Sequence, residues 1–263
     1  MKPKIIKKLQ KIYGIKLEPL TEIKWNSTGY VINNGHIIGL SIQSITITRT
    51  TFLYDAELSE LQMLCLDFDK ISNISFLAKY NNLKELSLNC NHYISDISAL
   101  TNKKSIKRLI LGNNAIEDIS SLKNLNNLEY LDLMNNSVSN IKPLAKLKSL
   151  QHLNLENNQI TNISPLAKLN IETINLSRNY ITDLTSLKDM TKLRDLNVSL
   201  NCIDNIKPLS SVSALKSLDL FGNKINDISP INIDKIYVTM DEQQRISWGI
   251  PTENTFRFPK IFI

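Results

Sequence analysis

The stretch that decides the fold is Leu150–Asn170, which reads LQHLNLENNQITNISPLAKLN. Its pattern, L-x-x-L-x-L-x-x-N-x-I-x-x-I-x-x-L-x-x-L-x-x, recurs with a period near 22 residues, and such a period is the sequence signature of a solenoid. Successive copies are 22, 23, 22, 22, 21, 22 and 22 residues apart, and they begin at Leu61, Leu83, Ile106, Leu128, Leu150, Ile171, Leu193 and Leu215.

Each part of the repeat predicts one piece of structure. Leu150, Leu153 and Leu155 predict a short strand that pairs with the strand of the next copy in a parallel sheet. Asn158 follows, and because its amide both donates and accepts, we expect a ladder of hydrogen bonds from its equivalents, Asp69, Asn91, Asn114, Asn136, Asn179, Asn201 and Asn223. Apolar residues then recur every third position, which favours a tight 3₁₀ or helical return. One position of this return holds a proline in four copies, Pro143, Pro165, Pro208 and Pro230.

The repeat resembles the leucine-rich repeat family. The stretches NNQITNI (157–163) and ISPLAKL (163–169) resemble the 22-residue subclass of bacterial internalins, to which the repeat regulatory subunit of protein phosphatase 1 is related. The resemblance covers about Leu61 to Ile233. It implies an α/β leucine-rich repeat solenoid with a concave parallel β-sheet, short 3₁₀ or helical returns on the convex side and a cap at each end. It says little about function, because the matching residues form the core.

The net charge of +6 is concentrated near the amino terminus. Residues 1–24 contain seven Lys and two Glu, which gives +5, so the remaining chain carries +1. Without a basic stripe along the repeats, we expect no nucleic-acid partner. The three cysteines suggest neither a disulfide framework nor a zinc site, and free thiols favour a reducing compartment. No secretory signal is evident, so we expect a cytoplasmic monomer, with secretion by another route left open.

Three segments are expected: a cap at 1–35, the solenoid at 36–238 and a capping tail at 239–263. Ile5, Ile6, Leu9, Ile12 and Tyr13 share one face of a helix predicted over residues 3–13, which stops at Gly14. We interpret it as a cap for the first coil, with a membrane-contacting basic helix or a partner-binding arm as alternatives. Asn33-Asn34-Gly35 predicts a hairpin whose second arm is the first solenoid strand, with Trp25 beneath it. Trp248, Phe256 and Phe258 suggest that the tail folds over the last coil, or else docks to a partner.

Two irregular stretches depart from the repeat. Thr46–Leu58 predicts an irregular first return, and Leu83–Ser105 holds one extra residue near His92. In that second stretch Lys103 and Lys104 occupy positions where an apolar residue is expected, which predicts a bulge and an exposed return; a functional loop is the alternative. At the other end, Val238 and the residues before it predict one last strand, in which Lys235 neighbours Ser217 and Tyr237 neighbours Asp219.

Strand residues that point away from the core must line the concave surface. In the middle and late repeats this face gathers aromatic residues among carboxylates, a combination typical of protein-binding surfaces. The candidate partner-binding residues are Tyr130, Asp132, Met134, His152, Glu156, Asp195, Asp219, Phe221 and Tyr237.

The sequence favours a non-enzymatic module that binds one protein partner on its concave face. No nucleophile motif, P-loop or metal-binding motif accompanies His152, and Cys65 faces the groove without a basic activator, so we expect no catalytic residue, metal or cofactor. Two alternatives follow from the resemblance alone: a regulatory subunit of a phosphatase or other enzyme, and an internalin-like bacterial factor that interacts with a host.

Overall fold

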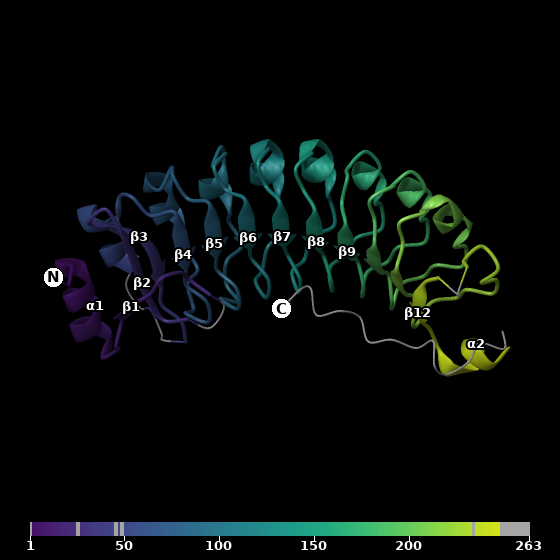
Figure 1. The fold of residues 1–263 in the computed structure, drawn as a ribbon, viewed down its shortest axis with the longest axis horizontal. Helices are drawn as coiled ribbons and strands as arrows, with labels where there is room; N and C mark the ends of the chain where they lie inside the picture. The colour runs from purple at the N-terminus through teal and green to yellow at the C-terminus, as the bar shows by residue number, and fades with distance from the viewer. Residues whose placement is uncertain (1, 25–26, 45–46, 48–49, 233–234, 248–263) are drawn as a thin grey trace. The chain divides into compact units, whose positions relative to one another are not determined.

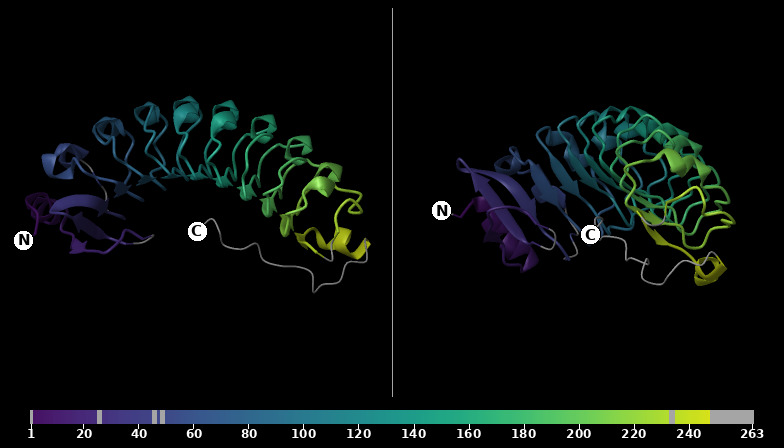
Figure 2. Two further views of the ribbon diagram at one scale, coloured as in Figure 1. Left: turned by 45° about the horizontal axis from the view of Figure 1, so that its top comes forward. Right: turned by 45° about the vertical axis from the view of Figure 1, so that its right-hand side comes forward.

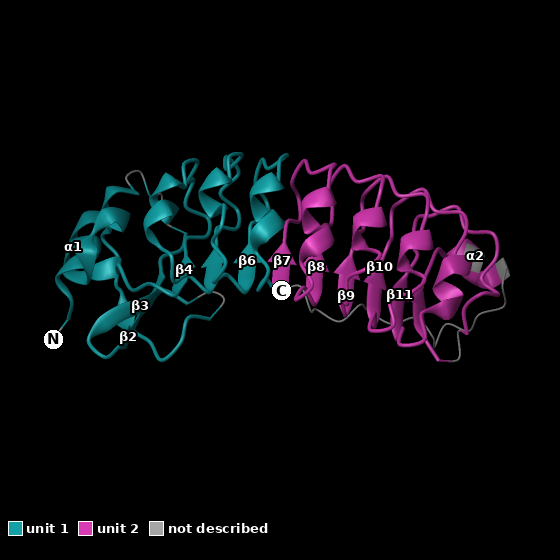
Figure 3. Cartoon of the chain, turned by 90° about the horizontal axis from the view of Figure 1, so that it is seen from above, with its two compact units in different colours: residues 1–128 teal, residues 129–263 magenta. Residues whose placement is uncertain are grey.

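The computed structural model describes residues 2–24, 27–44, 47, 50–232 and 235–247. The chain divides into two compact units, residues 1–128 and 129–263 (Figure 3). In both units short strands lie on one side and 3₁₀ helices lie on the other, joined by turns (Figures 1 and 2). Each unit is therefore a stack of the coils that the repeat predicts.

Unit 1 begins with a helix and a hairpin before the regular coils. Its helix and strands are α1 (Lys4–Tyr13), β1 (Glu18–Pro19), β2 (Gly29–Asn33), β3 (His36–Ser41), β4 (Met63–Cys65), β5 (Glu85–Ser87) and β6 (Arg108–Ile110). Its 3₁₀ helices are η1 (Thr50–Tyr54), η2 (Ala56–Leu58), η3 (Ser75–Lys79), η4 (Ser98–Leu100) and η5 (Ser120–Asn124). Strands β2 and β3 are antiparallel, and all other neighbours from β1 to β6 pair in parallel.

Unit 2 consists of regular coils and a short final helix. Its strands and helix are β7 (Tyr130–Asp132), β8 (His152–Asn154), β9 (Thr173–Asn175), β10 (Asp195–Asn197), β11 (Ser217–Asp219), β12 (Tyr237–Thr239) and α2 (Glu242–Ser247). Its 3₁₀ helices are η6 (Lys142–Lys146), η7 (Ser164–Leu166), η8 (Thr185–Leu187) and η9 (Lys207–Ser211). Every neighbouring pair of strands from β7 to β12 is parallel.

The repeat leucines and isoleucines form the core. Leu150, Leu153, Leu155 and Ile160 are completely buried between adjacent coils. Burying such a side chain contributes roughly 1.5–3 kcal/mol. A single coil has no second layer to cover its apolar edge, so the neighbouring coil supplies that burial.

The predicted asparagine ladder is confirmed at Asn91, Asn158, Asn179, Asn201 and Asn223, whereas Asp69, also a predicted member, has a carboxylate that cannot donate the amide hydrogen bonds. The amide of Asn158 donates to the carbonyl oxygens of Leu133 at 2.9 Å and Leu155 at 3.1 Å, and its Oδ1 accepts from the Val138 backbone N–H at 2.9 Å. Asn91 makes the same bonds in unit 1, and Asn179, Asn201 and Asn223 repeat them in unit 2. Each side chain thus ties its own coil to the one before it.

Two further recurring positions were not predicted. The residue before each ladder position has a left-handed backbone, which suits Asn157 or Gly222 but is unfavourable for Leu200. A second Asn or Asp, such as Asn162, accepts a hydrogen bond from the backbone N–H two residues later and so begins the 3₁₀ return. The spacing of these polar residues is visible in the sequence beside the apolar pattern.

The amino-terminal predictions are largely confirmed. Helix α1 ends at Tyr13 and is followed by Gly14, whose backbone is left-handed, and the hairpin turns at Asn34 and Gly35 with φ of 49° and 81°. One residue of the predicted apolar face was misplaced, because Ile12 is 55% exposed. Thr50–Leu58 forms two 3₁₀ helices, so that return is irregular as expected. Trp25 and residues 248–263 lie outside the described residues, and the three-segment division stays a prediction.

Two other predictions were wrong. Lys103 does not lie on an exposed return: it is 6% exposed, and its Nζ donates to the carbonyl oxygens of Ala78 and Tyr80 and to Oδ1 of Asn81, each at 3.0 Å. A long side chain can bury its stem in an apolar layer and satisfy its ammonium at the end of that layer. The register of the last strand is shifted by two residues, because Tyr237 pairs with Ser217, where Lys235 had been expected.

Candidate functional site

The candidate site is the open sheet face of unit 2, formed by the strand side chains that point away from the core. In β7 and the residues after it, the leucines at 131 and 133 are completely buried, so the alternating side chains of Tyr130, Asp132 and Met134 point outward. The same face continues along the unit, because each strand residue pairs with the equivalent residue of the next strand. All nine predicted site residues lie on this face: Tyr130, Asp132, Met134, His152, Glu156, Asp195, Asp219, Phe221 and Tyr237.

Exposure divides the predicted residues into three groups. Phe221 and Tyr237 are 45% and 56% exposed, which is high for side chains of their size. Tyr130 and Asp132 are buried at 7% and 5% exposure. The other five are half-buried: Met134, His152, Glu156, Asp195 and Asp219. A partner that lies on this face would meet Phe221 and Tyr237 first.

Tyr130 and His152 lie together on neighbouring strands. Their ring centroids are 6.0 Å apart with planes inclined by 44°. His152 Nδ1 also lies 2.8 Å from the Thr173 hydroxyl on the next strand, so the imidazole is held by both neighbours. These two contacts limit the orientation of the imidazole ring.

Two of the predicted carboxylates have a structural task. Asp132 Oδ1 accepts from the Met134 backbone N–H at 2.8 Å, and Asp219 Oδ1 accepts from the Phe221 backbone N–H at 3.1 Å. Asn makes the same bond at this position in the three coils between them. Asp132 and Asp219 therefore begin the turn after the strand, in addition to any role in binding.

Glu156 is positioned at the centre of the face by two neighbours. Its Oε2 accepts from Asn175 Nδ2 at 3.0 Å, and its Oε1 lies 3.9 Å from Arg178 Nε. Arg178 is 59% exposed at its side chain, so this ion pair is screened by water and contributes little to stability. The contacts nevertheless limit the rotamers of the carboxylate.

Two carboxylates of the face have a pKa above the ordinary value for Asp. Burial raises the pKa of Asp195, although the nearby positive charges of Lys216, Arg194 and His152 oppose the rise. Burial also raises the pKa of Asp219, and the charge of Asp241 raises it further, while the Phe221 N–H acts in the opposite direction. A cation brought close to either group would favour the charged form.

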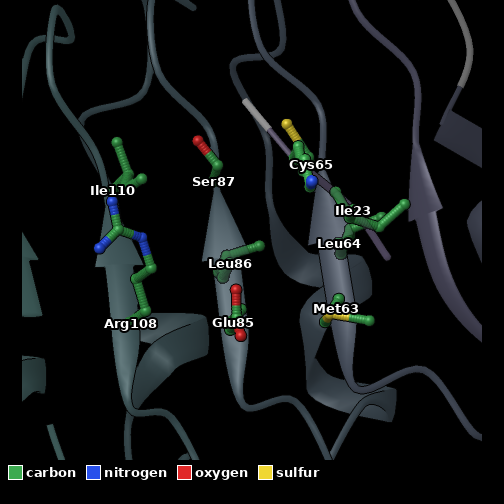
Figure 4. A pocket seen from close by; sticks show the side chains of 10 residues that line it. Ile23, Met63, Leu64, Cys65, Glu85, Leu86, Ser87, Arg108 and Ile110 are labelled. Atoms are coloured by element: carbon green, nitrogen blue, oxygen red, sulfur yellow. The ribbon is translucent and has the colours of Figure 1, made fainter. Parts of the chain in front are cut away.

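Sequence reasoning missed a buried polar cluster in unit 1, beside a hollow on the strand side (Figure 4). The hollow is lined by Met63, Glu85, Arg108 and others. Beside it Asp67 accepts from the Ser87 hydroxyl at 2.7 Å and from Cys65 Sγ at 3.3 Å. Burial and the Asp67 charge raise the pKa of the Cys65 thiol, so the sulfur stays protonated at neutral pH. Cys65 lines this hollow, as expected for a residue that faces the groove, but it is only 6% exposed.

Metal sites and membrane spans are two other classes of functional feature. Among the residues that the structure describes, no group of three His, Cys, Asp or Glu side chains could hold a metal ion. No helix within the same ranges is long and apolar enough to cross a membrane. The arrangement on the open sheet face is one of aromatic, amide and carboxylate groups held on rigid strands.

Comparison with known proteins agrees with the repeat and the fold. The family model described as Leucine Rich repeats (2 copies) matches residues 104–146 and 127–168. The model described as Leucine Rich repeat matches residues 81–100, 189–206 and 214–228. The comparison with curated proteins gave no match.

Solved structures extend the comparison along most of the chain. Internalin C2 (inlC2) of Listeria monocytogenes is 32% identical with a TM-score of 0.64, over 78% of this chain and 81% of that one. Internalin inlF of the same organism is 28% identical with a TM-score of 0.62, over 76% and 68% of the two chains. A leucine-rich repeat protein of Leptospira interrogans, at 22% identity and a TM-score of 0.58 over 76% and 59%, shows the fold alone.

The chain is thus a leucine-rich repeat protein, of a fold typical of protein–protein interaction modules. Within that family it belongs to the internalin-like proteins, as the 22-residue repeat predicted. Such proteins are typically non-enzymatic. The relation to the phosphatase regulatory subunit stays a prediction.

Proposed function

We propose that the chain is a non-enzymatic protein-binding module whose partner lies on the open sheet face of unit 2. The single observation that carries this proposal is the exposure of Phe221 and Tyr237, on adjacent coils of the same face. The fold does not require either side chain there, because equivalent positions in other coils hold Ser177, Ser199 and Thr173. Large exposed aromatic residues are the usual anchors of protein interfaces.

The chemistry of the face indicates the kind of partner. Glu156, Asp195, Asp219 and Asp241 place negative charge along unit 2, and Phe221 and Tyr237 add apolar surface beside it. A partner segment that presents Lys or Arg together with apolar side chains would satisfy both features. Burial raises the pKa of Asp195 and Asp219, and a cation of the partner beside either group would favour its charged form. Because salt screens the attraction between charges, the affinity of such a partner should fall as the salt concentration rises.

The test is affinity capture of the partner with the full chain and matched variants. Phe221→Ala with Tyr237→Ala removes both anchors, while Tyr180→Ala removes an aromatic side chain that is 60% exposed but follows a ladder position, off the open sheet face. We expect the double variant to lose a partner that wild type and Tyr180→Ala retain, with little change in the thermal midpoint. Tyr130→Ala is a poor probe, because its ring is buried against His152.

Retention of every partner by the double variant would contradict the assignment of this face. If Tyr180→Ala alone lost the partner, the binding surface would instead include Tyr180, in the turn that follows the ladder residue Asn179. A capture at rising salt adds an independent readout, since a partner held partly by charge should be released before one held by apolar contact alone.

A second candidate function rests on the two internalin relatives. On that alternative the chain is a bacterial factor that acts on a host outside the cell that makes it. The first candidate keeps it in the cytoplasm, where its three free cysteines would remain reduced. Fractionation of the native organism distinguishes the two: detection in the medium or at the surface supports the internalin-like role, and confinement to the cytosol supports the first.

A further inference from the structure

We propose that α1 has a second role besides capping the first coil: its exposed lysine stripe, made of Lys4, Lys7, Lys8 and Lys11, binds an anionic lipid surface. This contact is separate from the open sheet face and does not depend on the proposed function.

The geometry of α1 separates two faces. Ile5, Ile6 and Leu9 are at most 1% exposed, because they pack onto the body of unit 1. Tyr13 stacks edge-on against Phe52 at 5.9 Å, which fixes the other end of the helix. With about 100° of rotation per residue, the four lysines fall within roughly 100° of arc on the opposite side, over about 10 Å of helix. All four are exposed, and α1 lies at the amino-terminal end of unit 1 (Figures 1 and 3).

The charge of the lysine stripe is unfavourable for the helix itself. Like charges three and four residues apart repel one another, and Lys4 in the first turn of α1 opposes the helix dipole, although Lys11 in the last turn is favoured by it. The backbone N–H of Ile5 instead bonds to Glu57 from η2 at 3.1 Å. The ion pairs of the described residues include none of the four lysines, whereas Lys16 and Lys24 are each paired with a Glu. A helix that served only as a cap would be more stable with mixed charges. We therefore interpret the lysine stripe as a binding surface for an external anion.

Three features favour a lipid surface over an acidic protein. The stripe contains only Lys, a compact point charge that lacks the fork geometry with which Arg recognises individual carboxylates. Ile12 is 55% exposed at the edge of the stripe, where it can enter a headgroup layer. Residues 1–24 carry +5 of the net +6, so an extended anionic surface would attract this end of the chain first.

The experiment is sedimentation of the full chain with vesicles. The vesicles contain phosphatidylcholine alone or with about 30% phosphatidylglycerol, near 0.1 M salt, where the Debye length is about 10 Å. Each Lys near an anionic surface contributes about fivefold to the partition coefficient. We therefore expect binding to the anionic vesicles only, and a loss of about 100-fold or more when the four stripe lysines become Gln.

Matched variants separate this contact from charge in general. The control changes four exposed lysines of unit 2 to Gln and should alter binding by less than about fivefold: Lys146, Lys168, Lys188 and Lys207. Ile12→Ser should weaken binding several-fold, while Ile246→Ser, at a residue that is 64% exposed on α2, should not. Release of the wild-type chain by about 0.5 M salt needs no variant and supports the proposal independently.

Three results would overturn the proposal. The first is failure of the wild-type chain to bind anionic vesicles. The second is an equal loss in the stripe variant and the unit 2 control. The third is capture of the wild-type chain by polyglutamate-coated beads but not by vesicles, which would assign the stripe to an acidic protein.

Discussion

The sharpest prediction concerns one residue of the ladder, Asn179, changed to Ala. Its amide donates to the carbonyl oxygens of Leu155, Leu176 and Ser177 at 2.9, 3.1 and 3.1 Å, and its Oδ1 accepts from the Ile160 N–H at 3.0 Å. The three carbonyl oxygens each keep a second donor after the change, but the buried Ile160 N–H keeps none. One orphaned donor costs about 1–3 kcal/mol and each weakened bond a fraction of that, so we expect a loss of about 3 kcal/mol.

Urea unfolding followed by circular dichroism measures this loss. At about 3 kcal/mol per molar urea, the midpoint should fall by about 1 M. Hydrogen exchange at the Ile160 amide gives a local readout that remains valid if the coils unfold in more than one step. The control is Asn157→Gly: Asn157 is exposed, with φ of 50°, and Gly adopts that backbone without strain. If both variants lose less than about 1 kcal/mol, the ladder does not join the coils as described.

Three further changes test other contacts. Gly222→Ala should lower stability by about 1–2 kcal/mol in thermal unfolding, because φ is +68° and the new Cβ would lie 2.6 Å from Cδ2 of Leu200; a neutral change would refute the strain. Asp219→Asn keeps the turn acceptor but removes a buried charge. Because the folded pKa of Asp219 is raised above 3.8, its charge destabilises the fold above that folded pKa, so the variant should melt higher at pH 7 and lose its advantage below pH 3.8; an advantage independent of pH would exclude this cause. Lys103→Ala should lose about 2 kcal/mol, since three acceptors lose a buried donor, whereas Lys104→Ala, which is exposed, should be nearly neutral; equal losses would refute the assignment.

The sequence predicted the fold well because one repeat recurs many times along the chain. Residue types at fixed spacing predict the strand, the ladder residue and the 3₁₀ return of each coil. A wrong assignment in one coil can therefore be corrected from the equivalent positions of the next. The errors fall where that redundancy ends. Lys103 was predicted to be exposed because a lysine at that position of its own coil has no partner there. Its Nζ instead donates to carbonyl oxygens of the preceding coil, which the local sequence does not reveal. The shift of Tyr237 arose because the last coil is shortened.

The sequence located the face that carries the candidate site, but it could not rank the nine residues by exposure. Alternation placed all nine residues on one face, since side chains of a strand alternate by geometry. Exposure depends on what neighbouring coils contribute, so nothing in the sequence distinguished buried Tyr130 and Asp132 from exposed Phe221 and Tyr237. The role of Asp219 in its turn rests on a hydrogen bond from the Phe221 N–H, which is a feature of the folded backbone.

The most direct measurement is site-specific photo-crosslinking in native lysate, with a benzophenone amino acid placed in turn at Phe221, Tyr237 and Tyr180. If a partner lies on the open sheet face of unit 2, positions 221 and 237 should form the same discrete protein adduct, and position 180 should form none. An adduct at 180 alone, or equal adducts at all three positions, would contradict that account.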